Sequence, residues 1–169
     1  MAERIDQWAW WMADVIPDER IDEVEDLMPQ LTDHPFESIT KDRIKEVMNG
    51  GWSVIATIHE DGKVCAMAEL HVFTTLLERK GQIDNVVADE KYRGRGFGEK
   101  IMKTLLDRAF VVDRRPLDLV QLTSNPDNPK RYAARKLYEK LGFREKYKGL
   151  FVITRDEWLA KRGEFGNRD

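Results

Sequence analysis

Cysteine is nearly absent from this chain, since Cys65 is the single one in 169 residues. A lone cysteine cannot form an internal disulfide, so the sequence excludes disulfide-stapled folds and favours a reducing, cytoplasmic compartment. The apolar stretch around Cys65 favours a buried packing residue over a nucleophile. The histidines His34, His59 and His71 have no metal-ligand spacing to it, so the sequence predicts no metal site.

Long apolar runs and an excess of basic residues are missing as well. No window approaches the roughly 18 continuous apolar residues of a membrane-spanning helix, and no basic region with an apolar core begins the chain. The formal net charge of -3 argues against a dedicated nucleic-acid binder. We therefore expect a protein with no membrane partner, folded as one domain over residues 1–169.

What the chain does contain is a turn rich in glycine and arginine. It covers residues 93–98, Arg-Gly-Arg-Gly-Phe-Gly, between an apolar run and an amphipathic helix. Glycines let the backbone approach a ligand closely, and a helix start offers free N–H groups and the positive end of the helix dipole. Such a turn is typical of a pyrophosphate site.

Spacing separates three phosphate-binding patterns at this turn. A P-loop ends in glycine, lysine and a hydroxyl residue, whereas Gly98 is followed by Glu99. Counted from Gly94 and Gly96, the dinucleotide pattern G-x-G-x-x-G has its third glycine position at Glu99. The pattern R-x-x-G-x-G does fit, with Arg93, Gly96 and Gly98.

Strands are predicted on both sides of the helix that follows the turn, over residues 81–88 and 117–122, which indicates a parallel crossover. A second amphipathic helix starts at Arg131 and ends before Gly142, a typical C-cap residue. Its apolar face carries Ala134, Leu137, Tyr138 and Leu141.

Two motifs in this order, R-x-x-G-x-G and then A-x-x-L-Y-x-x-x-G-F over residues 134–143, resemble those of the GNAT superfamily of N-acetyltransferases. The resemblance runs from about Trp52 to Ile153, and it extends to the first 50 residues only in general layout. It implies an α/β fold with a mixed, mostly antiparallel sheet and a central splayed parallel strand pair, flanked by helices. It also implies transfer of an acetyl group from acetyl-CoA directly to a primary amine of a small molecule or peptide, without a metal.

The resemblance also implies which residues contact acetyl-CoA. The turn holds the pyrophosphate, and the strand before it binds the pantetheine arm along its edge and polarises the thioester carbonyl through a backbone N–H. The implied residues are Val86, Val87, Ala88, Arg93, Gly94, Arg95, Gly96, Phe97, Gly98, Arg131, Ala134 and Tyr138. Many family members carry asparagine where this chain has Arg131, so this arginine either reaches a CoA phosphate or is a solvated surface charge.

Acetyl transfer to an amine needs a proton donor for the departing thiolate and a base for the amine. Tyr138 matches the acid tyrosine of the family, and its alternative role is a core tyrosine that satisfies a backbone carbonyl. For the base we expect Asp84 first, because the family often places an acidic residue there, and Glu69 second; each is otherwise a charge on a solvated sheet face. His71 shares a strand face with Glu69 and is a third candidate.

The remaining elements are predicted from local patterns. We expect strands over residues 8–15, 52–59, 64–73 and 147–154, with an Asp-Gly hairpin over 60–63, and helices over 17–31, 40–49 and 156–162. The tryptophans Trp8, Trp10, Trp11 and Trp52 are either an aromatic wall for the acceptor or core and dimer contacts. Homodimers are frequent in the family, which makes a homodimer a further expectation.

Two other functions stay open. A catalytically silent protein that binds acyl-CoA and reports it to a partner keeps the turn but has no use for Tyr138. A transferase acting on protein or aminoacyl-tRNA amines is compatible with a basic patch on this chain. We interpret that patch as one that binds the CoA phosphates. The residues of this patch are Lys91, Arg93, Arg95, Arg114, Arg115, Lys130, Arg131 and Arg135.

Overall fold

The computed structural model describes residues 20–31, 41–49, 52–112, 114–147 and 150–165, and within them six strands form one sheet. The strands are β1 (Trp52–Glu60), β2 (Lys63–Thr74), β3 (Arg79–Ala88), β4 (Leu119–Thr123), β5 (Arg144–Tyr147) and β6 (Leu150–Thr154). Their order is β1-β2-β3-β4-β6-β5, and β3 and β4 are parallel whereas the other neighbours are antiparallel. The predicted α/β fold, with one parallel pair in a mostly antiparallel sheet, is confirmed.

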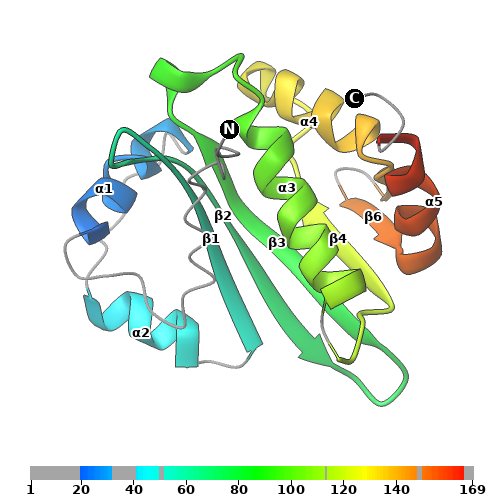
Figure 1. The fold of residues 1–169 in the computed structure, drawn as a ribbon. Coiled ribbons are helices and arrows are strands. Elements are labelled where there is room, and N and C mark those ends of the chain that lie inside the picture. The colour runs from blue at the N-terminus through cyan, green and yellow to red at the C-terminus, as the bar shows by residue number, and fades with distance from the viewer. Residues whose placement is uncertain (1–19, 32–40, 50–51, 113, 148–149, 166–169) are drawn as a thin grey trace, which may run out of the picture.

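Helices flank this sheet, with α3 lying across it and α1 and α2 beside β1 (Figure 1). The α-helices are α1 (Ile21–Glu25), α2 (Lys41–Asn49), α3 (Phe97–Asp107), α4 (Tyr132–Lys140) and α5 (Arg155–Phe165). The shorter elements are the 3-10 turns η2 (Met28–Gln30), η3 (Glu90–Tyr92) and η5 (Pro129–Arg131) and the π-helical turn η4 (Arg108–Val112). Within the described ranges, no helix has both the length and the apolar character that crossing a membrane requires.

Two buried apolar clusters hold the helices to the sheet. The larger cluster joins α3, α4 and α5 to strand residues that include Ala66 and Ile83. The smaller cluster joins α1, η2 and α2 to strand residues that include Ile55 and Met67. The consecutive residues Ala66 and Met67 belong to different clusters, as expected when successive side chains of a strand point to opposite faces. The two clusters therefore lie on opposite faces of the sheet.

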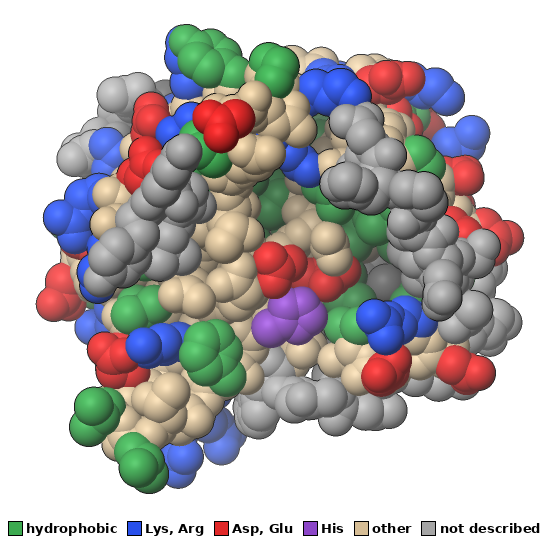
Figure 2. Space-filling view, turned by 180° about the vertical axis from the view of Figure 1, so that it is seen from behind, with side chains coloured by type: hydrophobic (Ala, Val, Ile, Leu, Met, Phe, Trp, Pro, Cys, Tyr) green, Lys and Arg blue, Asp and Glu red, His purple; other side chains and the backbone are tan. Residues whose placement is uncertain are grey.

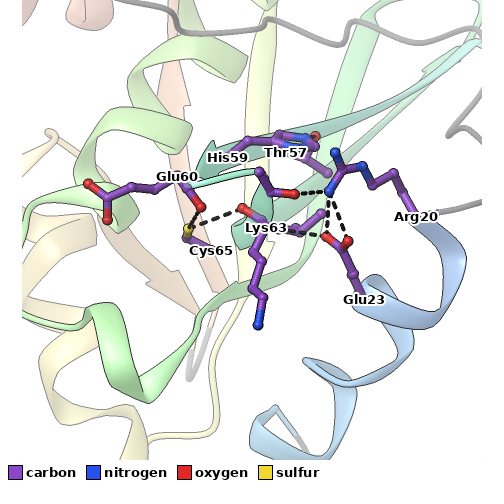
Figure 3. A network of polar contacts seen from close by, with 9 residues as sticks. Arg20, Glu23, Thr57, His59, Glu60, Lys63 and Cys65 are labelled. Carbon is purple, nitrogen blue, oxygen red and sulfur yellow. Dashed lines mark hydrogen bonds and ion pairs between the residues drawn. The ribbon is translucent and has the colours of Figure 1, made fainter.

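The β1–β2 hairpin turns at Asp61 and Gly62, whose φ angles are 50° and 77°. Positive φ at both residues is the type I′ geometry that the Asp-Gly pair predicts. The hairpin also anchors α1, because Glu23 Oε2 accepts the backbone N–H of Val64 at 2.8 Å. Arg20 pairs with Glu23 and donates to the carbonyl of Gly62 in the same network (Figure 3).

The crossover from β3 through α3 to β4 follows the prediction, and the apolar stripe of α3 is buried against the sheet. Its buried residues are Phe97, Ile101, Met102, Leu105 and Leu106. The second predicted helix, α4, ends at Lys140, and Gly142 follows its C-cap residue Leu141 with a φ of 94°. The N–H groups of Gly142 and Phe143 bond to the carbonyls of Glu139 and Tyr138, which is the Schellman pattern of helix ends.

Two predicted elements are corrected by the structure. The helix expected over 17–31 breaks into α1 and η2, because Pro29 has no N–H and its ring clashes with the carbonyl of Glu25 in a continuous helix. The strand expected over 147–154 gives way to two antiparallel strands, β5 and β6. The sequence of β5, Arg-Glu-Lys-Tyr, does not predict a strand, because its charged side chains lack the apolar pattern of a buried strand. Charged side chains are typical of edge strands, and β5 is the edge of the sheet. Outside the described residues lie the predicted strand over 8–15, the helix cap at Thr40 and His34.

Candidate functional site

The parallel pair β3–β4 comes apart part of the way along β3. Its register begins at Lys80 opposite Leu119 and ends at Ile83 opposite Leu122. Strand β3 continues to Ala88, and in the described part of the chain no strand pairs with this side of it beyond Ile83. The strands therefore splay, and the backbone of β3 from residue 84 to residue 88 presents an edge toward the gap.

A bulge on β3 lies at the point where the splay begins. Between the register pairs Glu69↔Asp84 and Met67↔Val87, β3 takes three steps while β2 takes two. Asn85 lies in this interval with a φ of 51°, a conformation that asparagine tolerates better than most residues. The bulge turns the end of β3 away from β4 and puts Val86, Val87 and Ala88 along the edge of the gap.

Two carboxylates face each other across neighbouring strands beside the bulge. Glu69 and Asp84 are register partners, and like charges directly opposite are normally destabilising. Two amide side chains offset this repulsion by donating hydrogen bonds to the carboxylates. Asn85 Nδ2 lies 3.0 Å from Glu69 Oε1, and Gln82 Nε2 lies 3.1 Å from Asp84 Oδ1. Gln121 of β4 adjoins these side chains, with its Nε2 3.0 Å from Gln82 Oε1. We call this line of polar side chains the acidic row. The structure thus brings both predicted base candidates together.

The third base candidate, His71, belongs to the same row. Its Nε2 lies 3.1 Å from Glu69 Oε2, and its Nδ1 lies 3.0 Å from the hydroxyl of Ser53 on β1. The hydrogen bond to the Glu69 carboxylate raises the pKa of His71, and the nearby charge of Asp84 acts in the same direction. The Glu69 side chain is 13% exposed and that of His71 33%. Solvent therefore reaches both side chains, but water screens their charges less than it would on a fully exposed surface.

This row lies on the face of the sheet opposite α3. By the period of two, Glu69 and His71 share a face of β2 with Met67, which belongs to the smaller apolar cluster. The space-filling view from behind shows acidic side chains and a histidine gathered at a hollow near the middle of the molecule (Figure 2). The row thus has a solvent-accessible hollow on the side where α1 and α2 pack.

The glycines of the turn have two different roles. Gly94 and Gly96 have φ angles of 79° and 81°, and the Gly96 carbonyl accepts the N–H of Lys100 at 3.0 Å. A Cβ at either glycine meets no described atom within 4 Å beyond its chain neighbours, so the space over the turn is open. At Gly98 a Cβ would lie 3.4 Å from the Leu137 side chain, an ordinary van der Waals contact, so α3 packs closely against α4 at this point.

The two arginines of the turn also differ. Arg95 pairs with Glu60 of the β1–β2 hairpin, and its guanidinium carbon lies 5.3 Å and 5.7 Å from the ring centres of Phe97 and Tyr92. Arg95 is therefore already engaged by a carboxylate and two rings. Arg93 is exposed at the start of the turn.

Arg131 makes a contact that neither sequence-based interpretation of it includes. It donates a hydrogen bond to the backbone carbonyl of Leu31, directly after η2. The neighbouring Gln30 Oε1 accepts the N–H of Glu90 in η3 at 2.8 Å. The end of η2 is thus tied both to the segment before the glycine turn and to the start of the second motif.

The predicted basic patch is split between two ends of the sheet. Arg114 and Arg115 precede β4, and the carbonyl of Arg115 accepts a hydrogen bond from Arg79 at the start of β3. The turn lies beyond the other end of β3, because a crossover helix returns the chain to the level at which the first strand began. The prediction that these two arginines join the patch near the turn is therefore wrong.

Tyr138 lies on the sheet-facing side of α4 and is only 5% exposed. Its ring centre is 6.1 Å from that of Phe143 and 5.9 Å from that of Phe151. Burial raises the pKa of the Tyr138 phenol to about 12, against the opposing effect of the Arg131 charge. Ala134, one turn earlier, packs against the same cluster. Tyr138 is therefore a neutral phenol at any physiological pH.

Sequence reasoning missed Asn85 and Gln82, whose amides contact the carboxylates, and it missed Gln121 and Ser53, which contact Gln82 and His71. For Asn85 one signal existed, because asparagine is depleted in strands and here stands directly before the apolar end of the predicted strand. Cys65 is buried, and burial raises the pKa of its thiol, which disfavours the nucleophilic thiolate. The described residues contain no group of three or more His, Cys, Asp or Glu side chains placed to hold a metal ion.

Comparisons with known proteins bear on this arrangement. The model of the acetyltransferase (GNAT) family matches residues 17–143. A putative acetyltransferase from Agrobacterium tumefaciens superposes with a TM-score of 0.66 at 23% identity, covering 80% of this chain and 94% of that one. Glucosamine-6-phosphate N-acetyltransferase from Arabidopsis thaliana gives a TM-score of 0.55 at 25% identity, with 71% and 83% covered.

A third similar structure is that of the NatC complex bound to Gag peptide and CoA. It superposes with a TM-score of 0.62 at 19% identity, covering 81% of this chain and 91% of that one. No curated protein sequence matches the chain. These structural similarities concern the fold and do not determine the acceptor.

Proposed function

Because this chain belongs to the GNAT family of acetyltransferases and is thus an acyltransferase, we propose that it transfers the acetyl group of acetyl-CoA directly to a primary amine. The splay of β3 from β4 carries this proposal, because it provides a gap lined on one side by a free strand edge and on the other by the end of β4. We propose further that residues 1–169 form one acetyltransferase domain and that the acceptor is a small molecule or a peptide.

On the donor side, the backbone supplies most of the binding groups. The positive φ angles of Gly94 and Gly96 and the open space above them fit a pyrophosphate held by N–H groups at the start of α3. Arg93 adds charge there, and Arg95 does so after release from Glu60. Phe97 and Gly98 stand in the first turn of α3, where their backbone N–H groups can bind the phosphates, while the Phe97 side chain is buried.

The edge of β3 fits the remainder of the donor. Its residues Val86, Val87 and Ala88 offer backbone N–H and C=O groups along the gap, which suit the amides of the pantetheine arm. A backbone N–H of this edge polarises the thioester carbonyl in the proposed reaction. Arg131 and Ala134 line the start of α4 on the same side as Tyr138.

The proton steps follow from the two polar groups at the gap. The acceptor amine forms a C–N bond to the acetyl carbon as the C–S bond breaks, so one proton leaves nitrogen and the thiolate gains a proton or a hydrogen bond. Asp84, or its register partner Glu69, receives the amine proton, directly or through water. Tyr138 is the hydrogen-bond donor to sulfur, since its phenol stays neutral.

The acidic row also favours a cationic acceptor. At neutral pH an ordinary amine is an ammonium ion, and two partly buried carboxylates at a hollow attract it. A small-molecule acceptor is in keeping with the similarity to glucosamine-6-phosphate N-acetyltransferase, at 25% identity. Protein and aminoacyl-tRNA amines stay the alternative, as does a silent acyl-CoA sensor. We also keep a homodimer and a reducing, cytoplasmic compartment as proposals, the latter favoured by the buried single cysteine.

The test combines thiol release from acetyl-CoA with calorimetric binding of acetyl-CoA. The assay uses a panel of small amines, polyamines, aminoglycosides, amino acids and peptides with free N-termini. We expect binding, and turnover with one amine class. Asp84→Asn should then lower kcat at pH 7 by about 100-fold and recover at alkaline pH, where the free amine no longer needs a base. Binding without turnover supports the sensor or a macromolecular acceptor, and absence of binding contradicts the proposal.

A further inference from the structure

Ser124 stands directly after β4 with a buried hydroxyl that has no hydrogen-bond partner. The residue is 8% exposed, and its Oγ is one of two buried side-chain polar atoms without a partner among the described residues. The other is Nε of Arg135, whose guanidinium already pairs with Glu145 and the carbonyl of Pro126. A buried hydroxyl without a hydrogen-bond partner destabilises the folded protein. Its presence at Ser124 therefore needs an explanation.

The position of Ser124 in the register supplies one. The last parallel pair is Ile83 opposite Leu122, so two steps further along each strand lie Asn85 and Ser124. Asn85 is the bulge residue with positive φ, where β3 turns away. Ser124 therefore stands at the mouth of the splay, opposite the bulge, at the level where a backbone partner from β3 is lost.

The side chain of Ser124 also lies on the same side as Tyr138. Leu122 is 1% exposed and Thr123 is exposed, so burial at Ser124 continues the row of β4 side chains that packs beneath α4. Leu122 is the register partner of Phe151, whose ring contacts that of Tyr138. The hydroxyl and the phenol thus flank the same end of the gap from β4 and α4.

We propose that the Ser124 hydroxyl binds the pantetheine arm of acyl-CoA. This inference rests on the proposed function. A serine hydroxyl has one donor and two acceptor positions, so it can pair with an amide N–H or an amide C=O of the arm. Binding then provides the partner that the free protein lacks, and the cost of the unpaired hydroxyl is removed only in the complex. Ser124 is a binding residue here and takes no part in bond making.

This assignment predicts effects of opposite sign on stability and on binding. Ser124→Ala removes an unpaired buried hydroxyl, so the Tm of the free protein should equal or exceed that of the wild type. The calorimetric Kd for acetyl-CoA should rise about 5- to 10-fold, the size of one lost hydrogen bond. The Kd for adenosine 3′,5′-bisphosphate, which has the nucleotide part of CoA without the arm, should stay unchanged.

Thr57 provides the matched control. It is also 8% exposed, but its hydroxyl has a partner, since Oγ1 lies 2.8 Å from His59 Nε2. Thr57→Val should therefore lower Tm and leave both Kd values unchanged.

Three results overturn the assignment of Ser124: an unchanged Kd for acetyl-CoA, an equal loss of affinity for both ligands, or a lower Tm of free Ser124→Ala. A wild type that binds neither ligand instead contradicts the proposed function itself. Wild-type binding together with unaffected Ser124→Ala binding removes only the role of Ser124.

Discussion

Glu69 and Asp84 show how single residues reveal a site. Side chains of like charge rarely occupy directly opposite positions of neighbouring strands, because their repulsion lacks the screening of bulk water. Here three amide and imidazole groups, those of Asn85, Gln82 and His71, contact the two carboxylates and hold their orientation. Paired carboxylates held by polar partners beside a strand gap are a frequent signature of functional sites, which is why we propose them as the base.

Tyr138→Phe separates catalysis from binding. Burial raises the pKa of the Tyr138 phenol to about 12, whereas an ordinary thiol has a pKa of about 8.5. Full proton transfer from the phenol to the thiolate is therefore uphill by about 5 kcal/mol. We therefore propose that Tyr138 contributes mainly a hydrogen bond to the developing thiolate. We expect Tyr138→Phe to lower kcat about 10- to 100-fold with nearly unchanged calorimetric Kd for acetyl-CoA. Unchanged kcat in steady-state assays removes Tyr138 from the reaction.

The pair Glu69–His71 makes stability depend on pH in a defined direction. Because the pKa of folded His71 is raised above its unfolded value of about 6.5, the folded state binds its proton more tightly. This stabilisation is fully present below pH 6.5 and is lost as the pH rises through the raised value. The other groups that face this imidazole are Asp84 and Ser53.

The corresponding measurement is Tm as a function of pH for the wild type and His71→Gln. The wild type should exceed the variant at pH 5 to 6, and the difference should shrink above neutrality. Glu69→Gln should abolish this pH-dependent part, because it removes the carboxylate that holds the proton. A difference in Tm that is the same at every pH contradicts the role of the pair.

At the scale of elements, the turn before α3 is the feature that depends on glycine. Gly96→Val should abolish acetyl-CoA binding, because the branched side chain occupies the open space over the N–H groups and disfavours the left-handed backbone. The strain alone, at least about 1–2 kcal/mol, should lower Tm as well. Calorimetric titration with acetyl-CoA measures the first effect and thermal unfolding the second.

Gly62 is the control for backbone strain. Its φ of 77° nearly equals the 81° of Gly96, and a Cβ there also meets no described atom within 4 Å. Gly62→Val should therefore lower Tm by a similar amount while acetyl-CoA still binds normally. If both variants bind alike, the turn is an ordinary strand-to-helix connection.

At the scale of the whole molecule, the sequence predicts what depends on neighbours along the chain. The Asp61-Gly62 hairpin, the crossover and the Gly142 cap follow from local backbone preferences, and the structure has all three. Glu69 beside Asp84 also follows from strand period and order. The splay is expected only from the family resemblance, whereas the bulge at Asn85 and the unpaired Ser124 are not expected at all, because they depend on the register between strands that lie far apart in sequence.

The contacts at the end of η2 have a consequence for how the two sides of the molecule communicate. Leu31 receives the Arg131 hydrogen bond and Gln30 receives that of Glu90, so a segment on the hollow's side of the sheet is attached to both motifs of the donor side. We expect that a donor which draws Arg131 away from Leu31 changes how the first helices fit around an amine. By linkage, an amine that fixes those helices changes donor affinity by the same factor. The coupling is the same whichever substrate binds first, so it shows itself as a donor Kd that changes with the concentration of the amine.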